Sequence, residues 1–181
     1  MTEPDDTECV RRTLAGDREA FGSLVDRYQK PLFNLAYGIL EDPDEAEEAA
    51  QAAFVKAFEN LASFDPARRF FSWLYRIALN EALNAAGRKR RFSRIEGDVP
   101  DEDRAGPAEE QLDQDEQLRA AIRALKEEHR VVVVLKHLQG LSYAEISQIL
   151  GTPEKTIKSR LFSARLALRK ILEHRGFTFH G

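Results

Sequence analysis

The chain is poor in cysteine, and Cys9 is its only one among 181 residues. A single thiol forms no internal disulfide and excludes a cysteine-based zinc site. No apolar run approaches the roughly 18 residues of a membrane span, and no basic start leads into an apolar stretch. The four histidines lack metal-binding spacing such as HExxH; they are His129, His137, His174 and His180. We therefore expect a cytoplasmic protein that has no signal peptide, inserts into no membrane and carries no metal or other cofactor.

Charge is distributed unevenly along a chain of ordinary composition, with 43% hydrophobic and 32% charged residues. Residues 96–116 hold ten acids against one base, Arg104, and include two glycines and two prolines. This composition predicts a flexible linker over residues 95–115, which like-charge repulsion keeps extended. The linker separates two predicted lobes, residues 1–94 and 116–181. A basic cluster ends the first lobe: Arg88, Lys89, Arg90, Arg91 and Arg94.

Three amphipathic helices are predicted in the first lobe. Asp17 is placed to cap the first, and Pro31 is expected to bend or divide it. Asp42, which a proline follows, marks the start of the second helix. A loop over residues 62–69 precedes the third helix, which begins near Phe71 and runs into the basic cluster. The second helix is expected to turn these residues inward: Ala46, Ala49, Ala53, Phe54, Ala57 and Phe58.

Helical spacing also dominates the second lobe. Residues 131–134 are four consecutive valines, which alone are compatible with a buried strand. Their neighbours Leu125, Leu135 and Leu138 follow helical spacing and favour a helix. No alternating strand pattern occurs elsewhere in the chain. The sequence therefore predicts an all-α protein of two small helical domains.

The last third of the chain predicts a helix-turn-helix. Ser142 and Glu145 form an S-x-x-E capping box at the start of a short helix. Gly151 is expected to end this helix. Thr152 is then placed as the cap of a second helix, with Pro153 at its first position, where a missing N–H has no cost. Two helices joined by so short a turn cross steeply, as in DNA-binding proteins of this kind.

The second of these helices carries an apolar face and a basic face. Plotted at about 100° per residue, it turns inward Ile157, Leu161, Ala164, Leu168 and Ile171. The opposite face holds Lys155, Lys158, Ser159, Phe162, Ser163, Arg169 and Lys170. Residues 155–175 carry seven Lys or Arg and one acid, net +6 in a chain whose total is −4. This excess indicates binding to DNA phosphates. The outward aromatic ring of Phe162 suits contact with a thymine methyl or with another protein.

Three runs of sequence narrow the function further. Residues 44–58 read DEAEEAAQAAFVKAF, residues 64–80 read FDPARRFFSWLYRIALN, and residues 129–165 read HRVVVVLKHLQGLSYAEISQILGTPEKTIKSRLFSAR. The first two closely resemble region 2 of the extracytoplasmic-function (group 4) sigma factors of bacterial RNA polymerase, and the third resembles their region 4. The resemblance covers nearly all of the chain outside the linker and the two ends. It implies a protein that binds core RNA polymerase, recognises the −10 and −35 promoter elements, and helps to melt the −10 region.

The resemblance also implies specific partners. Glu48 and Gln51 match positions through which the family docks on the clamp helices of the polymerase β′ subunit, whereas Ala52 replaces the acid usual after that glutamine. The polymerase β subunit and promoter DNA are further implied partners. An anti-sigma factor is expected to occlude the polymerase-binding surfaces and to hold the protein near a membrane, while the active form is nucleoid-associated. No small-molecule substrate is implied.

Residues 62–69 match the family's segment that captures an unstacked base of the −10 element. Extruding a base costs a few kcal/mol, which a binder recovers by holding the base and neutralising nearby phosphates. The residues implied for this role are Phe64, Arg68 and Arg69. On the next helix, polar residues recur every four positions and form a stripe that can track one DNA strand. They are Arg76, Asn80, Asn84 and Arg88. Trp73 and Tyr75 fall among apolar neighbours and are expected to pack in the core.

The −35 readers implied by the resemblance lie on the basic helix: Lys158, Ser159, Phe162, Ser163 and Arg165. Lys155 joins them on the outward face, where the family usually has a glycine. Ser163 stands where a basic residue is common in the family. We therefore expect a promoter preference that differs from that of other members.

Three other functions remain open on the sequence alone. A one-component repressor or activator uses the same helix-turn-helix, and a ligand pocket or a dimerisation helix would favour it. An enzyme acting on nucleic acid needs clustered carboxylates or a metal set, whereas the acids here crowd the linker and the helix surfaces. A phosphorylation-controlled antitermination or partner-switching protein needs a receiver aspartate, and Asp65 follows no receiver-like strand pattern. We expect no catalytic residues.

Overall fold

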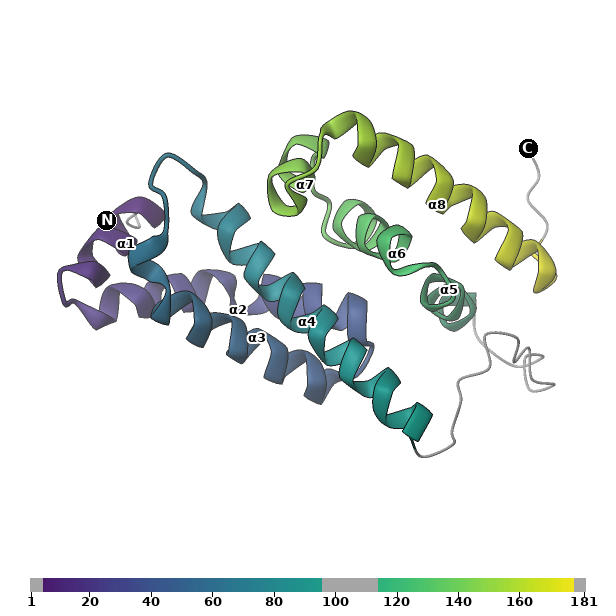
Figure 1. Cartoon of the computed structure of the whole chain (residues 1–181), viewed down its shortest axis with the longest axis horizontal. Coiled ribbons are helices and arrows are strands. Elements are labelled where there is room, and N and C mark those ends of the chain that lie inside the picture. Colours follow the sequence, from purple (N-terminus) through teal and green to yellow (C-terminus); the bar gives the residue numbers. More distant parts are fainter. Residues whose placement is uncertain (1–4, 96–113, 178–181) are drawn as a thin grey trace. The chain divides into compact units, whose positions relative to one another are not determined.

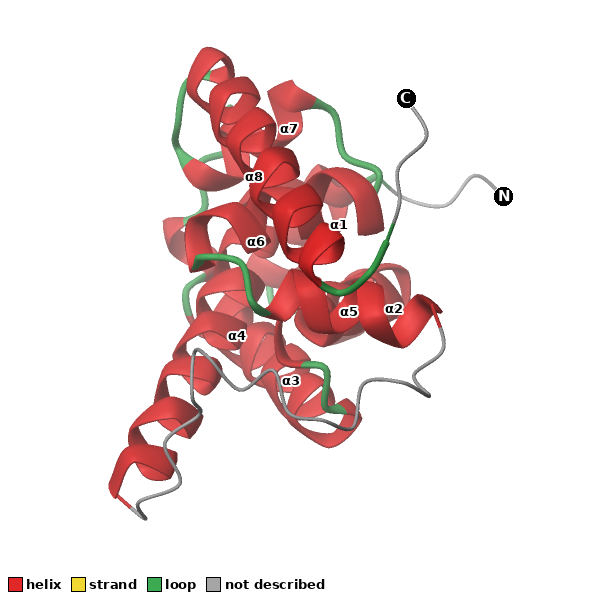
Figure 2. Cartoon of the chain, turned by 90° about the vertical axis from the view of Figure 1, so that its right-hand side faces the viewer, coloured by secondary structure: helices red, strands yellow, loops and turns green. Residues whose placement is uncertain are grey.

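The computed structural model describes residues 5–95 and 114–177. Within these two ranges every regular element is a helix and no strand occurs, as Figure 2 shows by colour. The chain divides into two compact units, one of residues 1–86 and 148–151 and the other of residues 87–147 and 152–181. The prediction of an all-α fold is confirmed. The predicted linker falls almost entirely outside the described residues.

The helices of residues 5–95 begin where the sequence predicts caps. Asp17 accepts hydrogen bonds from the backbone N–H groups of the second and third residues after it, at 3.1 and 3.3 Å. Asp42 caps the next helix in the same way, and Pro43 occupies its first position. Both predicted helix starts are confirmed. The elements in Figure 1 are α1 (Asp6–Leu14), α2 (Arg18–Leu40), α3 (Pro43–Glu59), the 3-10 turn η1 (Leu61–Ser63) and α4 (Phe70–Ile95).

Helix α1 is absent from the sequence-based predictions. Asp5 caps it through the backbone N–H two residues on, and acids in its first turn and arginines in its last are signals that could have found it. The carboxylate of Asp6 ties α1 to α2 by accepting hydrogen bonds from the Arg27 guanidinium and, at 2.6 Å, from the Tyr28 hydroxyl. Burial and this bond raise the pKa of Tyr28 above its ordinary value. The phenol therefore stays protonated and keeps donating.

Helix α2 continues through Pro31 without a break. The proline therefore does not divide the helix. A proline in a helix interior costs about 3 kcal/mol, because it removes one backbone hydrogen bond. Leu32 and Leu35 next to it are fully buried, and the burial of such a side chain contributes about 1.5–3 kcal/mol. Packing of these two leucines is sufficient to offset the lost bond.

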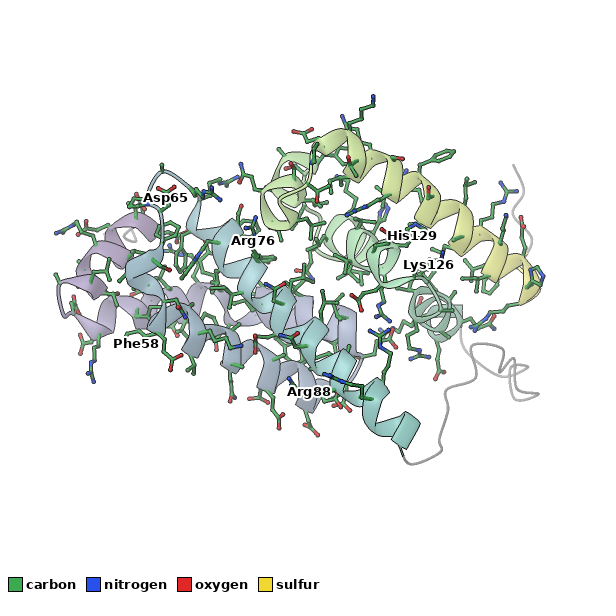
Figure 3. All side chains as sticks on the ribbon, in the orientation of Figure 1. Phe58, Asp65, Arg76, Arg88, Lys126 and His129 are labelled. Carbon is green, nitrogen blue, oxygen red and sulfur yellow. The ribbon has the colours of Figure 1, made fainter. Side chains whose placement is uncertain are left out.

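Helix α3 lies along α2 and buries small side chains (Figure 1). Small residues let two helix backbones approach closely. Phe54 is only half-buried and Phe58, labelled in Figure 3, is 43% exposed. The prediction that Phe58 points inward is therefore wrong, because alanines fill the inner face of α3. The ring of Phe58 instead packs edge-to-face with that of Phe21, with centroids 5.1 Å apart. The buried residues of α3 are Ala46, Ala49, Ala50, Ala53 and Ala57.

Helix α4 packs on α2 and α3 through larger side chains. The ring of Tyr28 lies 6.0 Å from that of Phe70 and 6.3 Å from that of Phe71. Further along, Lys56 of α3 forms a 2.5 Å ion pair with Glu81 of α4. These contacts hold α4 at two separate points and leave one of its faces to solvent.

The elements of residues 114–177 are α5 (Gln114–Arg123), α6 (Glu127–Val133), the π-helical turn η3 (Val134–Leu138), α7 (Tyr143–Leu150) and α8 (Glu154–His174). The four valines at 131–134 are buried in α6 and at the first position of η3. Of the two alternatives for this segment, helix is therefore confirmed. Helix α8 packs against both α5 and α6.

Candidate nucleic-acid interface

The helix-turn-helix begins with a reciprocal cap. The hydroxyl oxygen of Ser142 accepts a hydrogen bond from the backbone N–H of Glu145 at 3.2 Å. In return, the Glu145 carboxylate accepts one from the backbone N–H of Ser142 at 2.9 Å. The flanking residues Leu141 and Ile146 are both buried. The predicted capping box is confirmed.

The turn between α7 and α8 uses a glycine in the left-handed region. Gly151 has φ +62°, which a residue without Cβ adopts at little cost. The N–H of Thr152 donates to the carbonyl of Ser147 at 3.2 Å and closes the end of α7. The predicted start of α8 is wrong by one residue. Pro153, with ψ 143°, is still extended and serves as the cap residue, so the first helical residue is Glu154.

The two faces of α8 have the predicted phase over its first half. Leu161 is 1% exposed, whereas Phe162 beside it is 65% exposed. Ile157 and Ala164 are fully buried on the same inward face. Toward the end of α8 the buried position lies one residue later than predicted. Leu168 and Ile171 are half-buried, and the buried position is taken by Leu172.

Around Phe162 the polar residues of the predicted −35 surface are all exposed: Lys155, Lys158, Ser159, Ser163 and Arg165. The Arg165 guanidinium lies 3.3 Å from Nε2 of His137, a neighbour that the sequence did not predict. His137 is exposed overall, but partial desolvation of its imidazole and the nearby charges of Arg165 and Lys136 lower its pKa. The ring is therefore neutral at neutral pH, which is the state in which a ring nitrogen accepts a hydrogen bond.

The loop of residues 62–69 presents two arginines to solvent. Arg68 and Arg69 are exposed, and Asp65, labelled in Figure 3, shapes the loop by accepting a hydrogen bond from the backbone N–H two residues on at 3.0 Å. The guanidinium of Arg68 lies 3.6 Å from the same carboxylate. An exposed ion pair at this distance is weak, so Arg68 can exchange Asp65 for a phosphate at little cost.

Phe64 in the same loop is buried, with an exposure of 7%. Its ring lies 5.5 Å from that of Phe70 and 5.4 Å from that of Trp73. The ring already has aromatic partners and anchors the loop to α4, so it must leave this cluster before it can hold an extruded base, as the sequence predicts. The expected core packing of Trp73 and Tyr75 is confirmed: Tyr75 is buried, and Trp73 is half-buried against Phe64 and Phe70.

The four-residue stripe lies along one face of α4, and Figure 3 labels Arg76 and Arg88 at its two ends. Arg76 is half-buried, while Asn80, Asn84 and Arg88 are exposed. Each step along the stripe advances about 6 Å. Lys89, Arg90 and Arg91 follow and are also exposed, whereas the side chain of Arg94 lies outside the described part. The stripe is thus available to a ligand over most of its length.

On α3, Glu48 and Gln51 are exposed one turn apart. The Gln51 amide donates to the Glu47 carboxylate at 3.2 Å. A groove of about 590 Å³ that the sequence did not predict lies beside them, between α2 and α3. Its apolar lining is Val25, Phe33, Ala50 and Phe54, and its rim is Asp26, Gln29, Lys30, Glu47 and Gln51. An apolar groove with a charged rim suits a partner helix.

Over residues 5–95 and 114–177, no three side chains of the kinds that bind metals come together. In the same ranges no helix has both the length and the apolar character needed to cross a bilayer.

Two family models match the chain in sequence order. The Sigma-70 region 2 model matches residues 24–92, and the Sigma-70 region 4 model matches residues 115–168. The chain is 34% identical to the RNA polymerase sigma-H factor of Pseudomonas aeruginosa, over 96% of either chain. It is 35% identical to the ECF RNA polymerase sigma factor SigW of Bacillus subtilis, over 90% of this chain and 94% of the relative.

Solved structures give the same result. CnrH in complex with the cytosolic domain of CnrY has a TM-score of 0.71 and 28% identity, over 93% of this chain and 97% of that one. The sigma factor RpoE in complex with the anti-sigma factor NepR, from Bartonella quintana, has a TM-score of 0.66 and 25% identity, over 84% of this chain and 96% of that one. The similarity therefore extends over both units.

Proposed function

Because this chain belongs to the extracytoplasmic-function group of the sigma-70 family, we propose that it brings core RNA polymerase to promoters through separate contacts with the −10 and −35 elements. Members of this family are transcription-initiation factors and not catalysts. The observation that carries the proposal is the presence of both DNA-binding regions in one chain, in order. Two weak contacts held at fixed spacing by polymerase combine through effective concentration into one tight site.

The −35 contact is proposed for the exposed face of α8, with Phe162 at its centre. Phe162 is suited to an apolar contact with a base edge or a thymine methyl, while hydroxyl groups contact either bases or backbone. Basic side chains around it contact phosphates and give affinity that depends little on sequence. The proposed set is Lys155, Lys158, Ser159, Phe162, Ser163 and Arg165.

The −10 contact is proposed for the loop of residues 62–69 and the stripe on α4. With Phe64 buried, the exposed Arg68 and Arg69 neutralise phosphates beside the extruded base. Asn80 reads a base edge, because an amide both donates and accepts hydrogen bonds. Arg76 and Arg88 contact the backbone, and Asn84 lies between them on the stripe. This division gives base recognition to an amide and affinity to the arginines.

Core polymerase is proposed to bind the exposed face of α3 at Glu48 and Gln51, on the β′ clamp helices, with a further contact to the β subunit. The neighbouring groove between α2 and α3 supplies apolar area that the two polar side chains lack. Such area compensates for Ala52, which provides no polar contact. The same surface is a suitable target for an anti-sigma factor.

We also propose that an anti-sigma factor controls this protein. The relative CnrH is bound to the cytosolic domain of CnrY, and RpoE is bound to the anti-sigma factor NepR. An anti-sigma factor keeps this chain in the cytoplasm, near a membrane if the factor is itself anchored there, and its release makes the chain nucleoid-associated.

The proposed function predicts that the purified chain added to core polymerase will initiate at a small set of promoters that core alone does not use. Run-off transcription over a library of genomic fragments measures this. Transcripts that are identical with and without the chain would contradict the proposal.

The proposed polymerase contact predicts a second result. Glu48→Lys combined with Gln51→Ala should weaken core binding about tenfold or more, a loss of about 1.4 kcal/mol, because it removes an amide and places like charge against basic helices. Helix content should not change, since both side chains are exposed. Fluorescence titration against core polymerase measures the effect.

Glu19→Lys is the matched control, because it makes the same charge change at the exposed start of α2. It should leave core binding near the wild-type value. Equal losses in the two variants would mean that net charge, and not this face of α3, sets the affinity.

A further inference from the structure

Two lysines from different elements share one aromatic ring in the second unit. Nζ of Lys136 lies 4.8 Å from the ring centroid of Tyr143, and Nζ of Lys158 lies 5.2 Å from the same centroid. Both distances are within the range of cation–π attraction. Lys136 and Tyr143 belong to none of the surfaces described above. Lys158 belongs to α8, the helix proposed to contact the −35 element. Lys136 and Tyr143 therefore lie next to the proposed DNA-binding surface.

Lys136 is the fixed member of this group. It lies in the π-helical turn η3, is half-buried, and its ammonium donates a hydrogen bond to the carbonyl of Leu141 at 2.9 Å. The carbonyl and the ring of Tyr143 together restrict the ammonium to one place. The two remaining N–H donors of the ammonium are suited to an acceptor that arrives from solvent.

Lys158 is the exposed member. Its ammonium also lies 4.0 Å from the carboxylate of Glu154 on the same helix. An exposed pair at this distance holds a lysine weakly, and a free lysine side chain loses considerable rotamer entropy when it binds. The ring of Tyr143 reduces that loss, because it already attracts the ammonium.

Two ammonium groups attracted to one ring repel each other in the free protein. An anionic ligand that contacts both ammonium groups removes the repulsion and gains from both charges. The Glu145 carboxylate is engaged in the reciprocal cap with Ser142, and the Glu154 carboxylate lies 4.0 Å from Lys158, beyond hydrogen-bond distance. A ligand that carries its own negative charge and oxygen acceptors therefore fits the group, and a DNA phosphate at the recognition helix has both.

We propose that Lys136 and Lys158 together bind one backbone phosphate of the −35 duplex, and that Tyr143 is a positioning residue that holds both ammonium groups for it. This inference rests on the proposed function for the choice of DNA. It extends the DNA-binding surface from α8 to the π-helical turn. It also assigns Lys158 to the backbone and leaves base contact to Phe162 and the serines.

The test is the salt dependence of binding by the full chain to a non-specific DNA duplex at low salt. Lys136→Met and Lys158→Met should each reduce the slope of log affinity against log salt by about one unit. Tyr143→Leu should lower affinity about two- to fivefold and reduce the slope although it changes no charge. Tyr143→Phe keeps the ring and should behave as the wild type.

A double-mutant comparison separates positioning from general damage. Tyr143→Leu should add nothing to Lys158→Met, because the lysine through which the ring acts is gone. It should keep its full effect when added to Lys170→Met, which removes an exposed lysine about 18 Å further along α8. Additive losses with Lys158→Met would overturn the positioning role. A wild-type slope in Lys136→Met, or no duplex binding by the wild type, would overturn the phosphate site whether or not Tyr143→Leu folds.

A second measurement identifies the phosphate in the holoenzyme. Single neutral methylphosphonates are placed along the −35 element of a promoter found by run-off transcription. One position should weaken the wild type and leave Lys136→Met unchanged, and a scan in which no position has this pattern overturns the proposal. If no promoter is found, the proposed function fails, while the salt experiment still decides whether the two lysines bind a phosphate.

Discussion

Phe64→Ala is expected to lower the free energy of unfolding of the first unit by about 3–5 kcal/mol, the range for truncating a buried aromatic residue. The ring is 7% exposed and lies against Phe70 and Trp73. Its loss leaves a cavity at the point where the loop of residues 62–69 meets α4. Trp73 is the only tryptophan of the chain, so its fluorescence during urea unfolding reports on this cluster directly.

Phe58→Ala is the matched control. It removes the same side chain from a site that is 43% exposed and should cost about 1–2 kcal/mol, since less apolar area leaves the protein interior. Arg68→Ala, in the loop that contains Phe64, should leave the unfolding curve unchanged and reduce opening of the −10 region. Should Phe64→Ala cost no more than Phe58→Ala but abolish promoter opening, the burial of Phe64 would be wrong and a direct contact with DNA would be favoured.

A pair of adjacent substitutions in α8 should separate stability from DNA recognition. Leu161→Ala is expected to destabilise the second unit by about 2–5 kcal/mol as a buried truncation, because the side chain is 1% exposed. Phe162→Ala should change stability by less than about 0.5 kcal/mol, since its ring is 65% exposed. Thermal unfolding followed by circular dichroism measures both.

Initiation should show the opposite order. Phe162→Ala should reduce initiation at −35-dependent promoters about tenfold, the equivalent of losing about 1.4 kcal/mol of contact with a base edge or methyl. Promoter titration with the holoenzyme measures this, at a temperature where Leu161→Ala is still folded. The assignment of the DNA-facing surface fails if Phe162→Ala unfolds the second unit as readily as Leu161→Ala.

The features that the sequence predicts well are local ones. Asp17, Asp42 and the pair Ser142–Glu145 cap helices through backbone groups two or three residues away, so these caps need no contact with the other helices. The exposure of Phe162 follows from helix periodicity in the same way. These predictions are independent of tertiary structure.

Apart from α1, whose cap and end charges are local signals, the features that the sequence does not predict depend on residues far along the chain or on small differences in energy. Burial of Phe64 is decided by Phe70 and Trp73, and the outward position of Phe58 is decided by how closely the alanines of α3 let α2 approach. The sharing of Tyr143 by two lysines depends on the π-helical turn, which has no sequence signal of its own. Helix periodicity carries no information about such contacts.

The single cysteine allows local opening of the first unit to be measured by thiol labelling. Cys9 is fully buried in α1, and burial raises the pKa of its thiol, so the folded chain presents almost no reactive thiolate. A thiol reagent reacts only when α1 opens, and with one site per molecule the labelling rate reports on this opening alone. At a reagent concentration where closing is faster than labelling, the rate is proportional to the equilibrium population of the open form. The labelling rate therefore measures the free energy of local opening. Comparing that rate with and without core polymerase, on the natural sequence, tells whether the enzyme holds α1 in place.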